Sequence, residues 1–347
     1  MSWQQQASTR RALDELADGL RLSVAAQQRA RSLAGLEPRR TGFWQALDRL
    51  LLILGTALLL AGVAALAAWN WVELGHLGRL FLLQLAVLVA GGLAWFYRLD
   101  SLAGQAAVMA AAVLIGVLLA AVGQTYQTGA DPYWLFLLWA VLLLPMALVA
   151  RQAGLWLLVL LLANLTLTLL WVQVLRPSGD FWADQRLFGP LPWLLWLARD
   201  AWLAFALVVL NTLVLVVWEW LGSQLSWLRA RWPLRLIGLG LVWPTVVPVL
   251  AWIVEPQRHQ GVTPLALLFL LTGGCLWFYR LRRRLDLFML TLALMSLIAV
   301  LVVAAGRWLV SDNLDGFLTL ALILVTLVGA ASFWLRRLAR AEALIHD

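Results

Sequence analysis

The segment 123–134 brings hydrogen-bonding side chains together beside aromatic ones, and it contains no Arg. Two Gln residues and a Tyr supply donors and acceptors, and a Tyr-Trp pair supplies apolar surface. This combination suits a sugar, a lipid headgroup or a peptide. The alternative is a structural turn whose amides cap two helix ends while its aromatic residues join the belt at the membrane surface. The candidate ligand-binding residues are Gln124, Tyr126, Gln127, Asp131, Tyr133 and Trp134.

A second chemical possibility is a metal site. Glu73 and His76 lie three positions apart, and Glu255 and His259 lie four apart, so each pair can share one face of a helical turn. Carboxylate and imidazole groups are zinc ligands. The alternative is that each pair is solvated at a helix end, and the unequal spacings favour that interpretation.

Ten apolar stretches must position these residues. Each is long enough to cross about 30 Å of hydrocarbon as a helix. They lack the alternation of a membrane β-barrel strand. The predicted spans are 51–70, 79–97, 102–122, 134–150, 155–174, 201–221, 236–254, 264–279, 287–305 and 317–335.

The composition agrees with this all-α membrane architecture. Hydrophobic residues make up 63% of the chain and charged residues 13%, which is too apolar for a water-soluble fold. Polar residues inside the spans include Asn164 and Asn211, which we expect to bridge helices. Glu219 lies near one end of its span, where pairing with a nearby Arg explains it.

The orientation follows from the Arg residues, which account for all 26 basic residues and give a net charge of +8. The excess of Arg on one side of the membrane predicts that both termini are cytoplasmic. Placement at helix ends, rather than on one soluble face, argues against a nucleic-acid partner. The outer side would hold only Arg79, Arg176, Arg186, Arg199, Arg258 and Arg307.

Residues 1–49 are the only sizeable soluble segment, and they predict a cytosolic amphipathic helical hairpin with a juxtamembrane segment. We expect residues 50–347 to form the ten-helix transmembrane domain. Residues 1–30 lack the apolar core of a cleavable signal peptide. Cys275 is the only cysteine, so no disulfide or thiolate cluster is expected within one chain.

The sequence predicts an internal duplication. The segments 91–99 and 273–281 differ at only two of their positions, and the same spacing carries Glu73 onto Glu255. The repeated helices must point the same way across the membrane. A parallel repeat of helices 1–4 and 7–10, with halves at about 50–151 and 235–340, fits this better than the inverted repeat of many carriers.

The Gly-Gln-x-Tyr motif at Gly123, the Leu138-Trp139-Ala140 step and the opening segment around Leu13 together resemble a bacterial inner-membrane family of unknown function. The resemblance covers mainly residues 10–150. It implies a multi-pass bacterial inner-membrane protein, and it carries no activity or functional residue.

The sequence therefore predicts a non-catalytic protein that binds an envelope component, a lipid-linked molecule or a partner subunit through the outer face at 123–134. The alternative is a transporter or flippase with a cavity between the repeats, and the third possibility is a membrane-embedded transferase using Asp131. No nucleotide-binding loop, nucleophile elbow or metalloprotease helix is present, so we expect neither an enzyme nor a cofactor. The expected partners are membrane lipids and a membrane or periplasmic protein.

Overall fold

The structure is a computed structural model of the 347-residue chain. It describes residues 75–99, 101–126, 131–175, 200–254, 256, 262–281, 286–309 and 314–346, with scattered positions between 44 and 65. The predicted hairpin at 1–49 and most of the first predicted span lie outside the described residues.

The described residues form helices and contain no β-strand, which confirms the all-α prediction. The helix α7 continues into a short π-helical turn, η1 (Trp171–Leu175), and a 3-10 turn, η2 (Ser226–Leu228), precedes α11. The long helices are α4 (His76–Phe96), α5 (Leu102–Tyr126), α6 (Pro132–Ala150), α7 (Ala153–Leu170), α10 (Ala201–Gln224), α11 (Trp232–Val254), α12 (Val262–Leu281), α13 (Leu287–Leu309) and α14 (Leu314–His346).

Eight of these helices are long and apolar enough to cross a membrane. The remaining one, α12, has a shorter apolar part, Pro264–Tyr279. Every predicted span from 79–97 onward overlaps one of the helices, because a continuous apolar run of this length can satisfy its backbone in lipid only as a helix. A multi-pass membrane protein follows.

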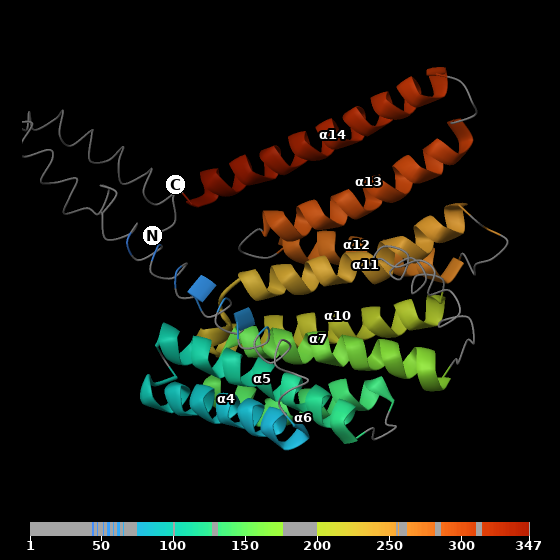
Figure 1. Cartoon of the computed structure of the whole chain (residues 1–347). Coiled ribbons are helices and arrows are strands. Elements are labelled where there is room, and N and C mark those ends of the chain that lie inside the picture. The colour runs from blue at the N-terminus through green and yellow to red at the C-terminus, as the bar shows by residue number, and fades with distance from the viewer. Residues whose placement is uncertain are drawn as a thin grey trace, which may run out of the picture. The chain divides into compact units, whose positions relative to one another are not determined.

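The chain divides into two compact units, Met1–Ala111 and Ala112–Asp347. In the first unit, the described part consists mainly of α4 and the beginning of α5. In the second unit, α6 packs on α7, α7 on α10, and α10 on α11. The helices α11, α12 and α13 pack on one another, and α14 packs on α13 (Figure 1).

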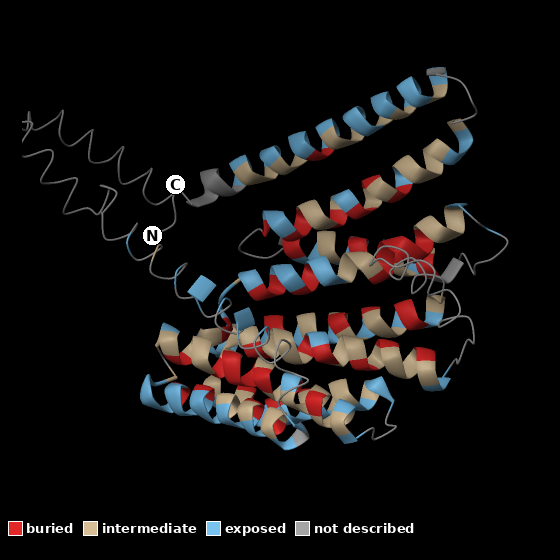
Figure 2. Ribbon diagram, viewed as in Figure 1, coloured by how far each residue is buried: buried red, intermediate tan, exposed pale blue. Residues whose placement is uncertain are grey.

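Burial in the second unit follows this packing order (Figure 2). Buried side chains lie where neighbouring helices meet, whereas α14 is mostly exposed along its length. The apolar surface of α14 has lipid rather than water as its solvent in a membrane.

Two contacts show how polar groups are satisfied between helices. Asn211 of α10 donates to the Asn164 side chain of α7 at 2.6 Å, which confirms that these amides bridge helices. Trp139 of α6 donates from its indole Nε1 to the carbonyl of Ala112 in α5 at 2.9 Å. The indole ring lies directly over Gly116, where a Cβ atom would come within 2.3 Å of it.

Candidate functional site

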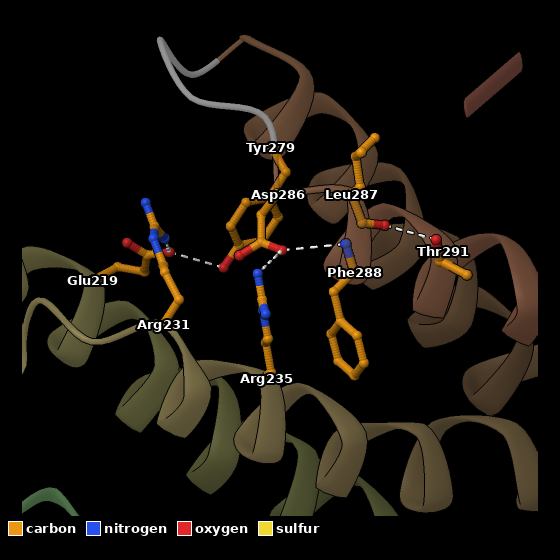
Figure 3. Close-up of polar contacts among 8 residues, drawn as sticks. All are labelled: Glu219, Arg231, Arg235, Tyr279, Asp286, Leu287, Phe288 and Thr291. Carbon is orange, nitrogen blue, oxygen red and sulfur yellow. Dashed lines mark hydrogen bonds and ion pairs between the residues drawn. The ribbon is translucent and has the colours of Figure 1, made fainter. Parts of the chain in front are cut away.

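A polar cluster joins three helices at one end of the second unit (Figure 3). Glu219, in the last turns of α10, is only 8% exposed. Its Oε1 atom accepts a hydrogen bond from Arg231 Nη1 at 2.9 Å and another from the Tyr279 hydroxyl of α12 at 3.0 Å. The expectation that Glu219 pairs with a nearby Arg is confirmed.

A second ion pair lies beside the first. Asp286 is 4% exposed, and its Oδ1 atom lies 3.5 Å from Arg235 Nη2. The same oxygen accepts a hydrogen bond from the backbone N–H of Phe288 at 3.2 Å, so Asp286 caps the start of α13. The guanidinium of Arg235 lies over the Phe288 ring, 5.6 Å from its centroid.

Helix geometry explains why the charges meet here. Arg231 and Arg235 are four positions apart at the start of α11, so they project from one face. The carboxylates come from the end of α10 and the start of α13. Because an isolated buried carboxylate is costly, the two arginines neutralise charges that the fold has withdrawn from solvent.

An apolar groove of about 570 Å³ extends from this cluster between α10, α11, α12 and α13. Such a volume is typical of small-ligand sites. Its lining side chains lie within 212–220 of α10, 238–245 of α11, 270–279 of α12 and 289–296 of α13. The ranges lie in the second halves of α10 and α12, around the middle of α11 and in the first half of α13, so the groove extends from beside the polar cluster to about the helix midpoints.

The length of the groove can be estimated along α11 and α12. The lining of α11, from Gly238 to Thr245, spans about 10 Å at the helical rise, and the lining of α12, from Leu270 to Tyr279, spans about 14 Å. These lengths are between a third and a half of the roughly 30 Å hydrocarbon thickness of a bilayer. The groove is therefore somewhat shorter than one leaflet is deep.

Most hydroxyl groups in the groove wall already have hydrogen-bond partners within the protein, so a bound molecule need not supply them. The hydroxyls of Thr245, Thr272 and Ser296 each donate to the carbonyl four positions earlier in their own helix, at 2.8, 2.6 and 2.9 Å. Thr212 Oγ1 has no hydrogen-bond partner within the described residues. The wall is otherwise built mainly from apolar side chains, so it suits hydrocarbon.

The groove opens sideways between α10 and α12. Trp220 and Trp277 line it and are 61% and 69% exposed, and Val216 and Leu270 beside them are also exposed. These side chains lie on α10, a candidate span, and in the apolar part of α12, where the surrounding medium in a membrane is lipid. A molecule can therefore enter from the bilayer without crossing water.

Two glycines shape the wall. At Gly238 an added Cβ would come within 2.7 Å of the Met289 side chain, so the glycine allows α11 and α13 to approach closely. At Gly274 an added Cβ would meet nothing within 4 Å, because that position faces the open groove. A larger side chain at Gly274 would therefore project into the groove.

The predicted outer motif differs from expectation in its boundaries. The helix α5 continues through Tyr126 and α6 begins at Pro132, so Gln124 and Tyr126 lie in the last turn of a helix rather than in a loop. Their polar side chains are compatible with helical backbone where a helix emerges from the apolar layer. Gln127 lies outside the described residues.

Several side chains of this motif face outward. Gln124, Tyr126 and Asp131 are exposed, and they form no side-chain hydrogen bond with the described part of the chain. Trp134 is exposed, Tyr133 is half-buried, and their ring centroids are 5.4 Å apart. The structure thus places five of the six candidate ligand-binding residues near the facing ends of α5 and α6.

The predicted metal site is not brought together within the described structure. Glu73, Glu255 and His259 lie outside the described residues, and His76 is the first residue of α4. Among the residues that the structure does describe, no three His, Cys, Asp or Glu side chains are placed to hold a metal ion.

Sequence reasoning missed most of the groove and its polar end. Signals were nevertheless present: Asp286 directly precedes an apolar run, as an N-cap does, and Arg231 and Arg235 continue the helical spacing of Gly238. Tyr279 stands out in the sequence only as part of the repeated segment 273–281. Its partner Glu219 lies 60 positions earlier, a contact that no local pattern predicts.

Comparison with known proteins gives a family match for part of the chain. Residues 14–156 match the family described as "Predicted membrane protein (DUF2157)". This confirms the resemblance to a membrane family of unknown function over that stretch, and bacterial origin stays a prediction. No curated protein and no solved structure matches the chain. The protein is a multi-pass membrane protein of unknown function.

Proposed function

We propose that this protein resides in the bacterial inner membrane with both termini in the cytoplasm, and that it binds the hydrocarbon chain of a lipid or lipid-linked molecule without catalysing a reaction. The observation that carries the proposal is the apolar groove of about 570 Å³ between α10 and α13, open to the bilayer beside Trp220 and Trp277. Hydrocarbon is the only abundant material at that depth.

Packing decides what fills the groove. An acyl chain in a bilayer is already out of water, so the hydrophobic effect adds no free energy to its binding. The binding depends instead on van der Waals contact and shape. An empty groove would leave its walls without partner atoms. A chain with one end at Glu219 and the other near Thr212 would supply them over about 10 Å.

The extent of the groove favours binding over transport. Alternating access requires a path that can open to each side of the membrane in turn. The lining residues of the four helices extend from the side of the polar cluster only to about the helix midpoints, and Pro244, Pro248 and Asn211 near the midplane are buried outside the lining.

Adjacent glycines of α12 provide a matched test. Gly274 lines the groove and Gly273 does not, yet at both positions an added Cβ would meet nothing within 4 Å. Gly274→Leu should fill the groove and lower lipid retention by about five- to a hundredfold, the equivalent of roughly 1–3 kcal/mol of overpacking. Gly273→Leu should retain lipid as the unmodified protein does.

Native mass spectrometry of the full-length protein, extracted in mild detergent, measures the bound lipid. Equal retention by both glycine variants would show that the groove is not the binding site. An unmodified protein that carries no lipid would refute the proposed function.

Orientation can be tested independently. In a Cys275→Ser background, a cysteine at Thr128 should react with an impermeant thiol reagent from outside intact cells, whereas one at Ser101 should not. This expectation follows from the excess of Arg on the proposed cytoplasmic side. The reverse labelling pattern would invert the topology.

A second candidate function is recognition of an envelope component or partner subunit at the outer ends of α5 and α6. The supporting observation is that Gln124 and Tyr126 are exposed and make no internal side-chain hydrogen bond among the described residues. Gln124→Ala with Tyr126→Phe should preserve thermal stability and abolish retention of a co-purifying component. Lost stability with retention intact would instead identify a structural turn.

A further inference from the structure

The groove ends beside Glu219 and Tyr279 in polar rather than apolar side chains, and the charged residues near that end indicate which lipid it selects. We infer that the groove takes an anionic phospholipid, with the lipid phosphate bound by Arg235. This inference rests on the proposed lipid binding and adds the chemical class of the headgroup.

Helical spacing connects the groove to this arginine. Gly238, Leu241 and Thr245 line the groove from α11 at positions i, i+3 and i+7. One step of three residues toward the start of α11 leads from Gly238 to Arg235, and a step of seven leads to Arg231. Both guanidinium groups therefore continue the face of α11 that forms the wall.

The two arginines are not equally available. Arg231 is held by the buried Glu219 carboxylate at 2.9 Å. Arg235 is 45% exposed, and its nearest carboxylate oxygen, on Asp286, is 3.5 Å away. A guanidinium has five N–H donors, so Arg235 retains donors for a phosphate while it stacks on Phe288.

The surrounding charge favours an anion. Glu219 and Asp286 are buried and already paired, so they present little negative charge at the mouth of the groove. Arg229 is exposed near the start of α11. The end of α14 adds further exposed arginines, at Arg336, Arg337 and Arg340. Each basic residue near a membrane surface contributes measurably to the attraction of acidic lipids.

The length of the groove fits a lipid of the adjacent leaflet. A phosphate at Arg235 lies at the end of the helices, and a chain descending about 15 Å from it reaches Thr245 near the midpoint of α11. A lipid of the opposite leaflet would have its phosphate at the other surface. The geometry thus selects both the headgroup charge and the side of the membrane.

The test uses the full-length protein in nanodiscs of equal parts phosphatidylglycerol and phosphatidylethanolamine with identical acyl chains. Native mass spectrometry then measures the ratio of the two lipids that remain bound. We expect phosphatidylglycerol to be enriched about fivefold, the preference that one basic residue supplies. Excess inorganic phosphate should not displace it, and displacement would indicate a free-anion site instead.

Two substitutions should change the ratio in opposite directions. Arg235→Gln should return it to the composition of the nanodisc. Asp286→Asn should raise it, because the competing carboxylate is removed while asparagine still caps α13. The matched control is Arg340→Gln, which removes an exposed arginine of α14 that contributes only to the general attraction, so it should lower the ratio far less than Arg235→Gln does.

The outcomes separate this inference from the proposed function. If lipid binds without a headgroup preference, or if neither Arg235→Gln nor Asp286→Asn alters the ratio, the headgroup inference is wrong and chain binding stands. If the Arg235→Gln variant fails to fold, the lipid ratio measured for the Asp286→Asn variant still tests the headgroup inference. If the unmodified protein retains neither lipid, both proposals fail.

Discussion

The hydroxyl of Tyr279 should contribute measurably to stability, because it bonds a buried carboxylate between two helices. Tyr279→Phe removes only the hydrogen bond to Glu219 Oε1, at 3.0 Å, and leaves Arg231 in place. Hydrogen bonds to charged groups contribute about 1.5–3 kcal/mol in soluble proteins, whereas membrane proteins average about 0.6 kcal/mol. Tyr279 is 2% exposed, so water cannot replace the bond, and we expect a loss of about 1–2 kcal/mol.

Combining Tyr279→Phe with Glu219→Leu tests this hydrogen bond more strictly than the single substitution does. Glu219→Leu leaves Arg231, which is about a third exposed, able to turn toward water, but it leaves the Tyr279 hydroxyl buried without its acceptor. We expect a loss of about 3 kcal/mol, at the lower end for a broken buried pair. Adding Tyr279→Phe should then cost nothing or restore stability, because it removes the orphaned hydroxyl.

The free energy of unfolding is measured by titration with denaturing detergent in mixed micelles, for both single variants and the double variant. Additive losses would mean that the two side chains do not interact. A change below about 0.5 kcal/mol for Tyr279→Phe would refute the hydrogen bond as a source of stability.

Two further predictions concern helix packing. Gly116→Ala should destabilise the protein by about 1–3 kcal/mol, because the added Cβ would overlap the rigid ring of Trp139. The control is Gly123→Ala in the same helix, where the added Cβ meets open space. In a thermal-shift assay this control should be neutral or slightly stabilising. Asn211→Leu should cost about 0.6–1.7 kcal/mol by leaving Asn164 without its partner, and adding Asn164→Leu should recover part of that loss in the same unfolding titration.

The spans could be predicted from sequence because one property determines them. A run of apolar residues long enough to cross hydrocarbon must be helical, whatever its neighbours are. The ends were less predictable: α5 continues through Gln124 to Tyr126, because polar residues are compatible with a helix once it leaves the apolar layer. The length of an apolar run therefore does not predict the residue at which its helix ends.

The groove could not be predicted in the same way. A cavity exists where side chains fail to fill the space between helices, and that depends on crossing angles and helix separation. Gly274 faces open space while Gly273, its neighbour, lies outside the lining, although sequence presents them as equivalent. Thr245 and Thr272 look like polar binding groups, but their hydroxyls bond their own helices.

The proposed duplication has a further consequence for the polar cluster. The helices α6 and α14 begin at Pro132 and Leu314, which are separated by the same spacing as Gly91 and Gly273. The residues of the Glu219–Arg231–Tyr279 cluster also have identical residues at this spacing, although Glu219 and Arg231 precede the predicted second half, 235–340. Their counterparts in the first half of the sequence are Glu37 for Glu219, Arg49 for Arg231 and Tyr97 for Tyr279.

The geometry of the two tyrosines differs, and that difference yields the last prediction. Both stand edge-on to the preceding phenylalanine, with ring centroids 5.3 Å apart for Phe96–Tyr97 and 5.1 Å apart for Phe278–Tyr279. Tyr97, however, is 48% exposed, and a hydroxyl that water can reach loses little when it is removed. Tyr97→Phe should therefore change the free energy of unfolding by less than about 0.5 kcal/mol. A loss equal to that of Tyr279→Phe would contradict this expectation and would mean that the Tyr97 hydroxyl also bonds a partner shielded from water.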